Sequence, residues 1–243
     1  PDARSMRHRG SGVVGYNVQT AVDVDHHLIV AHEVTNAVSD RRQLTRMARQ
    51  AKTALQTESL NVLADRGYYS GQELRSCEQN NIATYVPNSA TSNNKAKGQF
   101  DRSEFHYHAK DDEYECPAGE RLIYRFTRTE SGKEIRRYWS SSCPTCPIHA
   151  QCTTGKNRRV SRWVHEEVVE RAAARLAAKP DAMHIRRATV EHPYGTLKGW
   201  MGSTHFLTKT LDHVSTEMSL HVLAYNMKRV INLIGTKQLL EAI

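Results

Sequence analysis

An alternation of strand, helix and strand is clearest in residues 62–86, which read VLADRGYYSGQELRSCEQNNIATYV. The apolar residues 62–64 are typical of a short strand, and residues 82–86 are typical of a second one. Ser70 and Glu73 match the capping box that opens a helix between the two strands. Two strands joined through one helix predict a parallel, right-handed crossover, which is a building unit of α/β folds.

The sequence before this unit predicts a β-hairpin and a helix packed on it. Residues 16–22 and 28–34 are rich in β-branched and apolar residues, and the polar stretch 23–27 separates them. From residue 40 to residue 55, apolar residues recur at helical spacing. A helix with this pattern has one apolar face, which we expect to cover the hairpin.

Composition changes after Pro87. Residues 88–99 are rich in Asn, Ser, Lys and Gly, and a cysteine-containing region follows before helical periodicity returns near Val164. We therefore expect three parts: the first part of a core over 1–87, an insertion over 88–163, and the helical C-terminal part of the core over 164–243.

Three helices are expected after the insertion. Residues 164–178 have helical periodicity up to the break at Pro180, and a second helix is expected to begin near Asp181. Residues 215–234 carry apolar residues around much of the helix circumference. They predict a closing helix that is well buried.

The chain carries a surplus of positive charge. Of 243 residues, 34 are Lys or Arg and 26 are Asp or Glu, which gives a formal net charge of +8 and an isoelectric point of about 9.3. This surplus favours an anionic partner such as nucleic acid. The composition excludes collagen-like, coiled-coil and disulfide-scaffold classes. No apolar run approaches the roughly 20 residues of a membrane span, so we expect no membrane association.

Four of the five cysteines lie in the insertion, at Cys116, Cys143, Cys146 and Cys152. No secretory signal is visible, which makes a disulfide framework the less favoured interpretation. Their spacing is looser than a strict double Cys-x-x-Cys, and it suits either a structural Zn²⁺ site or free and partly oxidised thiols. Cys77 lies in a helical pattern and is expected to be a core residue.

Asp65 follows the apolar strand directly, in the stretch Asp-Arg-Gly-Tyr-Tyr. A carboxylate at the carboxyl end of a strand faces the crevice where open α/β sheets bind ligands. Gly67 allows the backbone to turn sharply at this point. The alternative interpretation is an ordinary turn with a solvated carboxylate.

A second charged cluster combines Arg187, Glu191 and Lys198. On a continuous helix, Arg187 lies about 40° and Lys198 about 20° from Glu191 around the axis. This face suits a metal-binding acid between phosphate-binding cations, or a row of surface ion pairs. Pro193 predicts a kink just past Glu191, which makes the position of Lys198 less well defined.

The residues after the strand over 62–64 resemble a motif of the DDE transposases of bacterial insertion sequences. That motif is Asp-x-Gly-Tyr after a core strand, matched here by Asp65, Gly67 and Tyr68. The resemblance spans most of the chain. It implies an α/β fold with a ribonuclease H-like mixed sheet flanked by helices, and a cysteine-containing insertion before the last catalytic helix.

The second family motif is Tyr, two residues, Arg, three residues, Glu, six residues and Lys. Arg187, Glu191 and Lys198 match its spacing, whereas His184 stands in the place of the Tyr. This departure leaves the role of position 184 open.

The resemblance implies that three acidic residues bind two Mg²⁺ or Mn²⁺ ions and support cleavage and strand transfer of DNA. Asp65 and Glu191 are two of them. The first acidic residue is expected ahead of the strand near Tyr16, which favours Asp2, with Asp23 as the rival.

The resemblance also implies that Tyr68, Arg187 and Lys198 contact DNA, with transposon ends and target DNA as partners. We expect a homodimer on DNA and a location in the bacterial cytoplasm at the nucleoid. The chain begins with Pro1 rather than Met, from which we expect an upstream continuation of the protein. The alternatives are a non-catalytic zinc-knuckle DNA-binding protein, a decayed transposase remnant, or a nuclease of the same fold without strand transfer.

Overall fold

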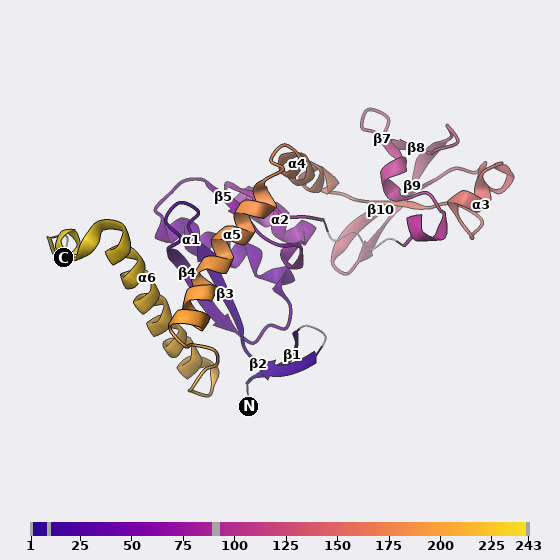
Figure 1. Cartoon of the computed structure of the whole chain (residues 1–243). Helices are drawn as coiled ribbons and strands as arrows, with labels where there is room; N and C mark the ends of the chain where they lie inside the picture. The colour runs from indigo at the N-terminus through magenta and orange to yellow at the C-terminus, as the bar shows by residue number, and fades with distance from the viewer. Residues whose placement is uncertain (1, 9–10, 89–92, 242–243) are drawn as a thin grey trace. The chain divides into compact units, whose positions relative to one another are not determined.

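The computed structural model describes residues 2–8, 11–88 and 93–241 (Figure 1). The chain divides into two compact units. The first comprises residues 1–89 with 168–243, and the second comprises residues 90–167. Among the described helices, none combines the length and the apolar composition that crossing a bilayer requires.

Two antiparallel hairpins begin the first unit. β1 (Arg4–His8) pairs with β2 (Ser11–Gly15), and β3 (Asn17–Val22) pairs with β4 (Ile29–Thr35). The second hairpin confirms the one predicted from residues 16–34. The sequence pattern does not predict the first, because residues 4–12 are mostly polar and lack an apolar alternation.

The predicted crossover is present. β5 (Leu60–Leu63) and β6 (Ile82–Tyr85) pair in parallel, and α2 (Gly71–Gln79) connects them. The register places Leu60 opposite Ile82. Parallel neighbours require such a connection, since a tight turn can only join antiparallel strands.

The start of α2 was predicted correctly, but its capping box is wrong. Ser70 is the N-cap residue, and within the described structure its side chain makes no capping hydrogen bond. The Glu73 carboxylate instead accepts a hydrogen bond from the backbone N–H of Thr45, at 2.8 Å. Glu73 therefore stabilises the first turn of the preceding helix rather than its own.

That preceding helix is α1 (Leu44–Ala54), which follows the short 3₁₀ turn η1 (Asp40–Arg42). The buried residues of α1 recur at intervals of three and four, as predicted; they are Leu44, Met47, Ala48 and Ala51. Leu44 and Ala48 share a core cluster with Leu74 and Cys77 of α2. Cys77 is fully buried there, which confirms its expected place in the core.

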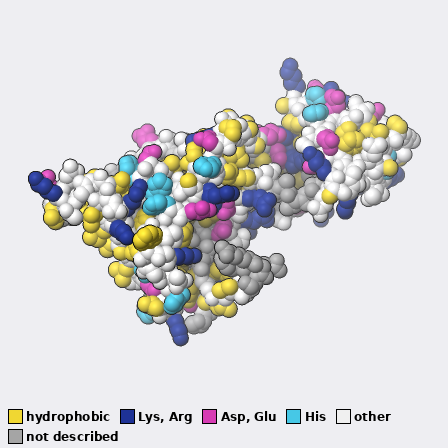
Figure 2. Space-filling view, viewed as in Figure 1, with side chains coloured by type: hydrophobic (Ala, Val, Ile, Leu, Met, Phe, Trp, Pro, Cys, Tyr) yellow, Lys and Arg dark blue, Asp and Glu magenta, His cyan; other side chains and the backbone are white. Residues whose placement is uncertain are grey.

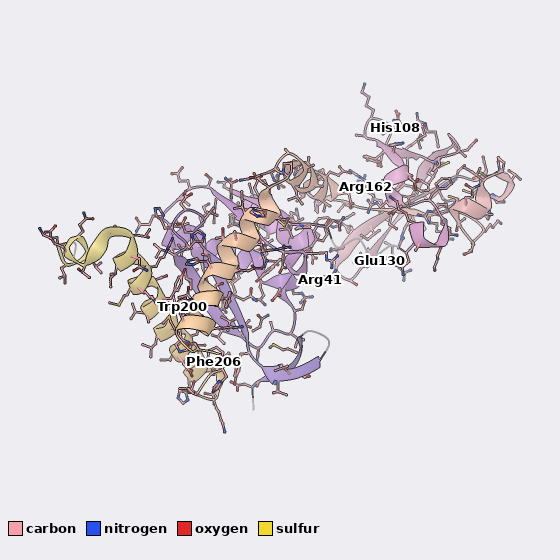
Figure 3. All side chains as sticks on the ribbon, viewed as in Figure 1. Arg41, His108, Glu130, Arg162, Trp200 and Phe206 are labelled. Atoms are coloured by element: carbon pink, nitrogen blue, oxygen red, sulfur yellow. The ribbon has the colours of Figure 1, made fainter. Side chains whose placement is uncertain are left out.

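The C-terminal part forms helices where the periodicity predicts them. They are α4 (Glu166–Ala177), α5 (Ala182–Gly195) and α6 (Leu211–Glu241). A π-helical turn, η6 (Thr196–Trp200), extends α5. Trp200 and Phe206, labelled in Figure 3, lie in the stretch between α5 and α6.

The predicted burial of the closing helix is wrong. Only one face of α6 is buried, through Val214, Met218, Val222 and Tyr225, which belong to a core cluster that also contains Ile29 and Val34 of β4. Apolar side chains also gather along its surface (Figure 2), and they include Leu220, Leu223 and Met227. Packing against a single sheet covers one face of a helix, whatever the composition of the other faces.

The second unit is built on a five-stranded antiparallel sheet of order β11-β10-β9-β8-β7. Its strands are β7 (His106–His108), β8 (Glu113–Glu115), β9 (Arg121–Glu130), β10 (Lys133–Trp139) and β11 (Val160–Trp163). Its short helices are η3 (Lys95–Lys97), η4 (Arg102–Glu104), η5 (Cys143–Thr145) and α3 (His149–Cys152). The core cluster contains Phe105, Tyr114, Leu122, Tyr138 and Val160.

Candidate active site around Asp65

Asp65 lies just beyond the carboxyl end of β5 and opens the 3₁₀ turn η2 (Arg66–Tyr68). Its Oδ1 accepts a hydrogen bond from the backbone N–H of Gly67 at 2.8 Å. A Cβ at position 67 would lie 2.9 Å from this oxygen, so any larger residue there would displace the end of the Asp65 side chain. The strand end and the turn together fix the direction of the Asp65 carboxylate.

A second carboxylate, that of Asp40, approaches the same turn. The Cβ position of Gly67 lies 3.6 Å from Asp40 Oδ2, so oxygens of Asp40 and Asp65 lie near one point. Asp40 Oδ1 accepts hydrogen bonds from the side-chain amides of Asn17 and Gln19, each at 2.7 Å. Sequence reasoning missed Asp40, and its signal is weak, since an acidic residue at the start of a helical segment is common.

The cation beside Asp65 is Arg186 of α5, not Arg187. The Arg186 guanidinium donates to Asp65 Oδ2 at 3.0 Å. The Asp65 side chain is 47% exposed and that of Arg186 25%. An ion pair with this exposure contributes less than about 1 kcal/mol to stability, so its value lies in positioning the carboxylate.

Tyr68 points inward and donates a hydrogen bond to the side-chain carbonyl of Gln19. Burial raises the pKa of Tyr68, and the nearby charges of Asp40 and Asp65 raise it further. Tyr68 therefore stays protonated and acts as a hydrogen-bond donor at neutral pH. Gln19 is itself buried and connects Tyr68 to Asp40.

These groups border a cavity of about 370 Å³ within the first unit. Asp40, Asp65, Tyr68, Arg186 and Tyr194 line it, together with apolar side chains of α1. Consecutive residues of β3 and β5 also line it, which indicates that both strands present an edge to the cavity. The acidic pair thus borders a hollow with mostly apolar walls.

The other predicted acidic residues lie elsewhere. Glu191 is solvent-exposed, and it lies about 140° around α5 from Arg186, the residue that contacts Asp65. The carboxylate of Asp2 accepts hydrogen bonds from the Tyr16 hydroxyl at 2.7 Å and the backbone N–H of Leu211 at 2.6 Å. The Tyr16 hydrogen bond, with that of Leu211, lowers the pKa of Asp2.

Asp23, the rival of Asp2, lies in the turn between β3 and β4, where it accepts from the backbone N–H of His26 at 2.7 Å. It borders the cavity four residues beyond Gln19 along the chain, about 13 Å at strand spacing. Across the described residues, no three Asp, Glu, His or Cys side chains are arranged to hold a metal ion. The structure therefore brings Asp40 to Asp65, but gathers neither Asp2, Asp23 nor Glu191 with them into such a group.

The predicted DNA-contacting cations are exposed. Arg187 lies on the surface of α5, and Lys198 lies in the π-helical turn, with its Nζ 5.7 Å from the centre of the Tyr194 ring. The expected kink just past Glu191 is displaced, because α5 includes Pro193 and departs from α-helical geometry only from Thr196. The helical alignment of Lys198 with Glu191 therefore does not hold.

The first unit combines helices with parallel and antiparallel strand pairs, so its class is α/β; among the described residues these pairs are separate and do not join into the expected mixed sheet. A family model described as "Transposase DDE domain" matches residues 1–227, so the chain belongs to the DDE transposase family. No curated protein and no solved structure matches the chain.

Proposed function

We propose that this chain is the catalytic domain of an insertion-sequence transposase that cleaves DNA at the element ends and joins them to target DNA. The observation that carries this function is the fixed carboxylate of Asp65 at the end of β5, beside a second carboxylate, in a chain of the DDE transposase family. The proposal includes a ribonuclease H-like core. The parallel β5–α2–β6 crossover and the β3–β4 hairpin support it.

The donor chemistry around Asp65 fits a hard divalent cation, because Mg²⁺ and Mn²⁺ prefer carboxylate oxygens. Asp65 would hold the cation, and the second family motif makes Glu191 its proposed partner; Glu191 lies on another face of α5 from Arg186, so α5 must turn for both acids to hold one ion. Asp2 stays the predicted first acidic residue, and Asp40 is a further candidate that the geometry adds. When bound, the cation supplies positive charge that activates an attacking oxygen and stabilises a leaving one.

The protein's own groups orient the reactants. Arg186 contacts the Asp65 carboxylate in the structure and supplies a positive charge beside it that a DNA phosphate can contact. Tyr68 keeps its proton and fixes Gln19, which in turn fixes Asp40. The exposed Arg187 and Lys198 are available for phosphate contacts, which give salt-dependent affinity.

Family membership makes DNA the partner. The proposal adds a homodimer assembled on DNA, because two element ends must be cut and joined together. It also adds a location in the bacterial cytoplasm at the nucleoid, where the substrate is.

The test uses linear DNA that carries both ends of the element encoding the chain. With Mg²⁺, Asp65→Asn and Glu191→Gln are each expected to lower the cleavage rate about a hundredfold or more, since several kcal/mol of charge stabilisation are removed. DNA binding, measured by gel shift, should change little. Asp181→Asn is the matched control, because Asp181 precedes α5 and its side chain makes no capping hydrogen bond.

Undiminished cleavage by Asp65→Asn would contradict the proposal. Binding without cleavage in the unaltered chain would favour the non-catalytic alternative. Asn variants of Asp2, Asp23 and Asp40, tested in the same way, identify the third acidic residue. Only replacement of a metal ligand should abolish cleavage while the protein stays folded.

A further inference from the structure

The second unit brings four cysteines from three separate segments to one place. Cys116 follows β8, Cys143 and Cys146 bracket the turn η5, and Cys152 ends α3. All four line a single cavity of about 20 Å³. A volume of this size holds one water molecule or one ion.

The backbone at these cysteines forms the tight turns typical of metal-binding loops. Cys116 accepts a backbone hydrogen bond from Gly119 at 2.8 Å, and Cys143 accepts one from Cys146 at 3.2 Å. In both turns a proline follows the first cysteine, at the position where its fixed φ favours a turn. The same tight turn, with proline after its first cysteine, therefore occurs twice around one cavity.

The thiols are chemically available. None of the four is in a disulfide, and each is partly buried. His149 also lines the cavity, and its Nε2 is buried without a hydrogen-bond partner in the described structure. Arg158 borders the same cavity and donates to the backbone carbonyl of Cys152 at 3.4 Å, so positive charge lies beside the sulfurs.

The second unit also has a physical need for such a site. A domain of fewer than about 80 residues rarely gains enough stability from its apolar core alone. Cys116 and Cys152 pack against this unit's core cluster. A single ion shared by these cysteines would therefore attach residues 143–152 to the sheet.

We propose that Cys116, Cys143, Cys146 and Cys152 bind one structural Zn²⁺ ion. Four thiolates complete a tetrahedral shell and leave no position for substrate, which makes the site structural rather than catalytic. In the described structure the four cysteines line the cavity but do not surround one point, so the proposed site requires their side chains to rotate toward its centre. This inference is independent of the proposed DNA cleavage.

The test is metal analysis of the whole chain, purified from zinc-supplemented medium under reducing conditions. We expect one zinc per chain by mass spectrometry. Replacing zinc with Co²⁺ should give the visible absorption of a tetrahedral thiolate site. Cys143→Ser combined with Cys146→Ser should remove both signals, whereas Cys77→Ala, which removes a thiol from the other unit, should retain them.

His149→Ala should also keep its zinc, because four cysteines suffice; loss of zinc in this variant would overturn the four-cysteine assignment. A chain that holds no zinc and gives no Co²⁺ spectrum would overturn the site altogether. So would disulfides between the four cysteines in protein isolated with its thiols protected. The Co²⁺ spectrum of the unaltered chain tests whether the thiolate site exists, even where a cysteine variant fails to fold.

Discussion

The two units of this chain organise charged side chains in different ways. In the first, carboxylates and one arginine meet at the end of a parallel strand and border a cavity. In the second, cations lie against aromatic rings: Arg162, labelled in Figure 3, lies 3.7 Å from the centre of the Tyr107 ring, and Arg125 and Arg159 lie 5.4 and 5.2 Å from that of Trp139. Arg162 is also buried. Some of the arginines in the insertion therefore stabilise its fold by packing on aromatic rings. The net charge alone overstates the number of cations that are available to bind DNA.

The largest expected effect is on folding stability, and it shows whether each unit is stabilised by its own core. Leu74→Ala in the first unit and Leu122→Ala in the second should each cost about 2–5 kcal/mol of unfolding free energy, because both side chains are almost fully buried. Hydrogen exchange with peptide-level resolution should show each loss confined to the unit that carries the substitution. Equal loss of protection in both units would break the comparison.

A smaller effect is expected at the turn that fixes Asp65. Gly67→Ala forces Asp65 Oδ1 away from a position 2.9 Å from the new Cβ, and the hydrogen bond to the residue 67 N–H is lost. The expected cost is about 1 kcal/mol of stability, as for loss of a helix cap. The cleavage rate should fall by more than this loss of stability explains, since the Asp65 carboxylate turns away from its site. Thermal melts and cleavage assays measure the two effects, and Gly15→Ala, where the Cβ meets open space, is the control.

The smallest expected effect concerns Asp2 and depends on pH. Hydrogen bonds from Tyr16 and Leu211 lower the pKa of Asp2 in the folded protein. Its contribution to stability is therefore present above the pKa of the unfolded chain and is lost as pH falls through the lowered value. Asp2→Asn should destabilise the protein at neutral pH, and the difference from the unaltered chain should vanish in acid. A difference in unfolding midpoint that is constant with pH would contradict this role.

Local patterns predicted much of the first unit. The hairpin of β3 and β4, the helix α1 and the β5–α2–β6 crossover all follow from periodicities that each segment carries alone. The Asp-x-Gly-Tyr stretch likewise pointed to Asp65, and a Cβ at position 67 of this turn would displace the Asp65 carboxylate. The antiparallel strands of the second unit were not predicted, because a strand such as β9 is exposed at most of its positions and therefore shows no apolar–polar alternation.

The sequence by itself determined where the strands and helices of residues 16–86 and the C-terminal helices form, which family the motifs resemble, and which carboxylate stands at the end of a strand. Only the tertiary structure decided that Arg186 rather than Arg187 faces Asp65, that Asp40 approaches the same turn, and that α6 buries a single face. The reason is that hydrogen bonding and periodicity within a segment are local. The rotation of a helix about its axis, and the approach of side chains from distant segments, are set by packing against the rest of the fold.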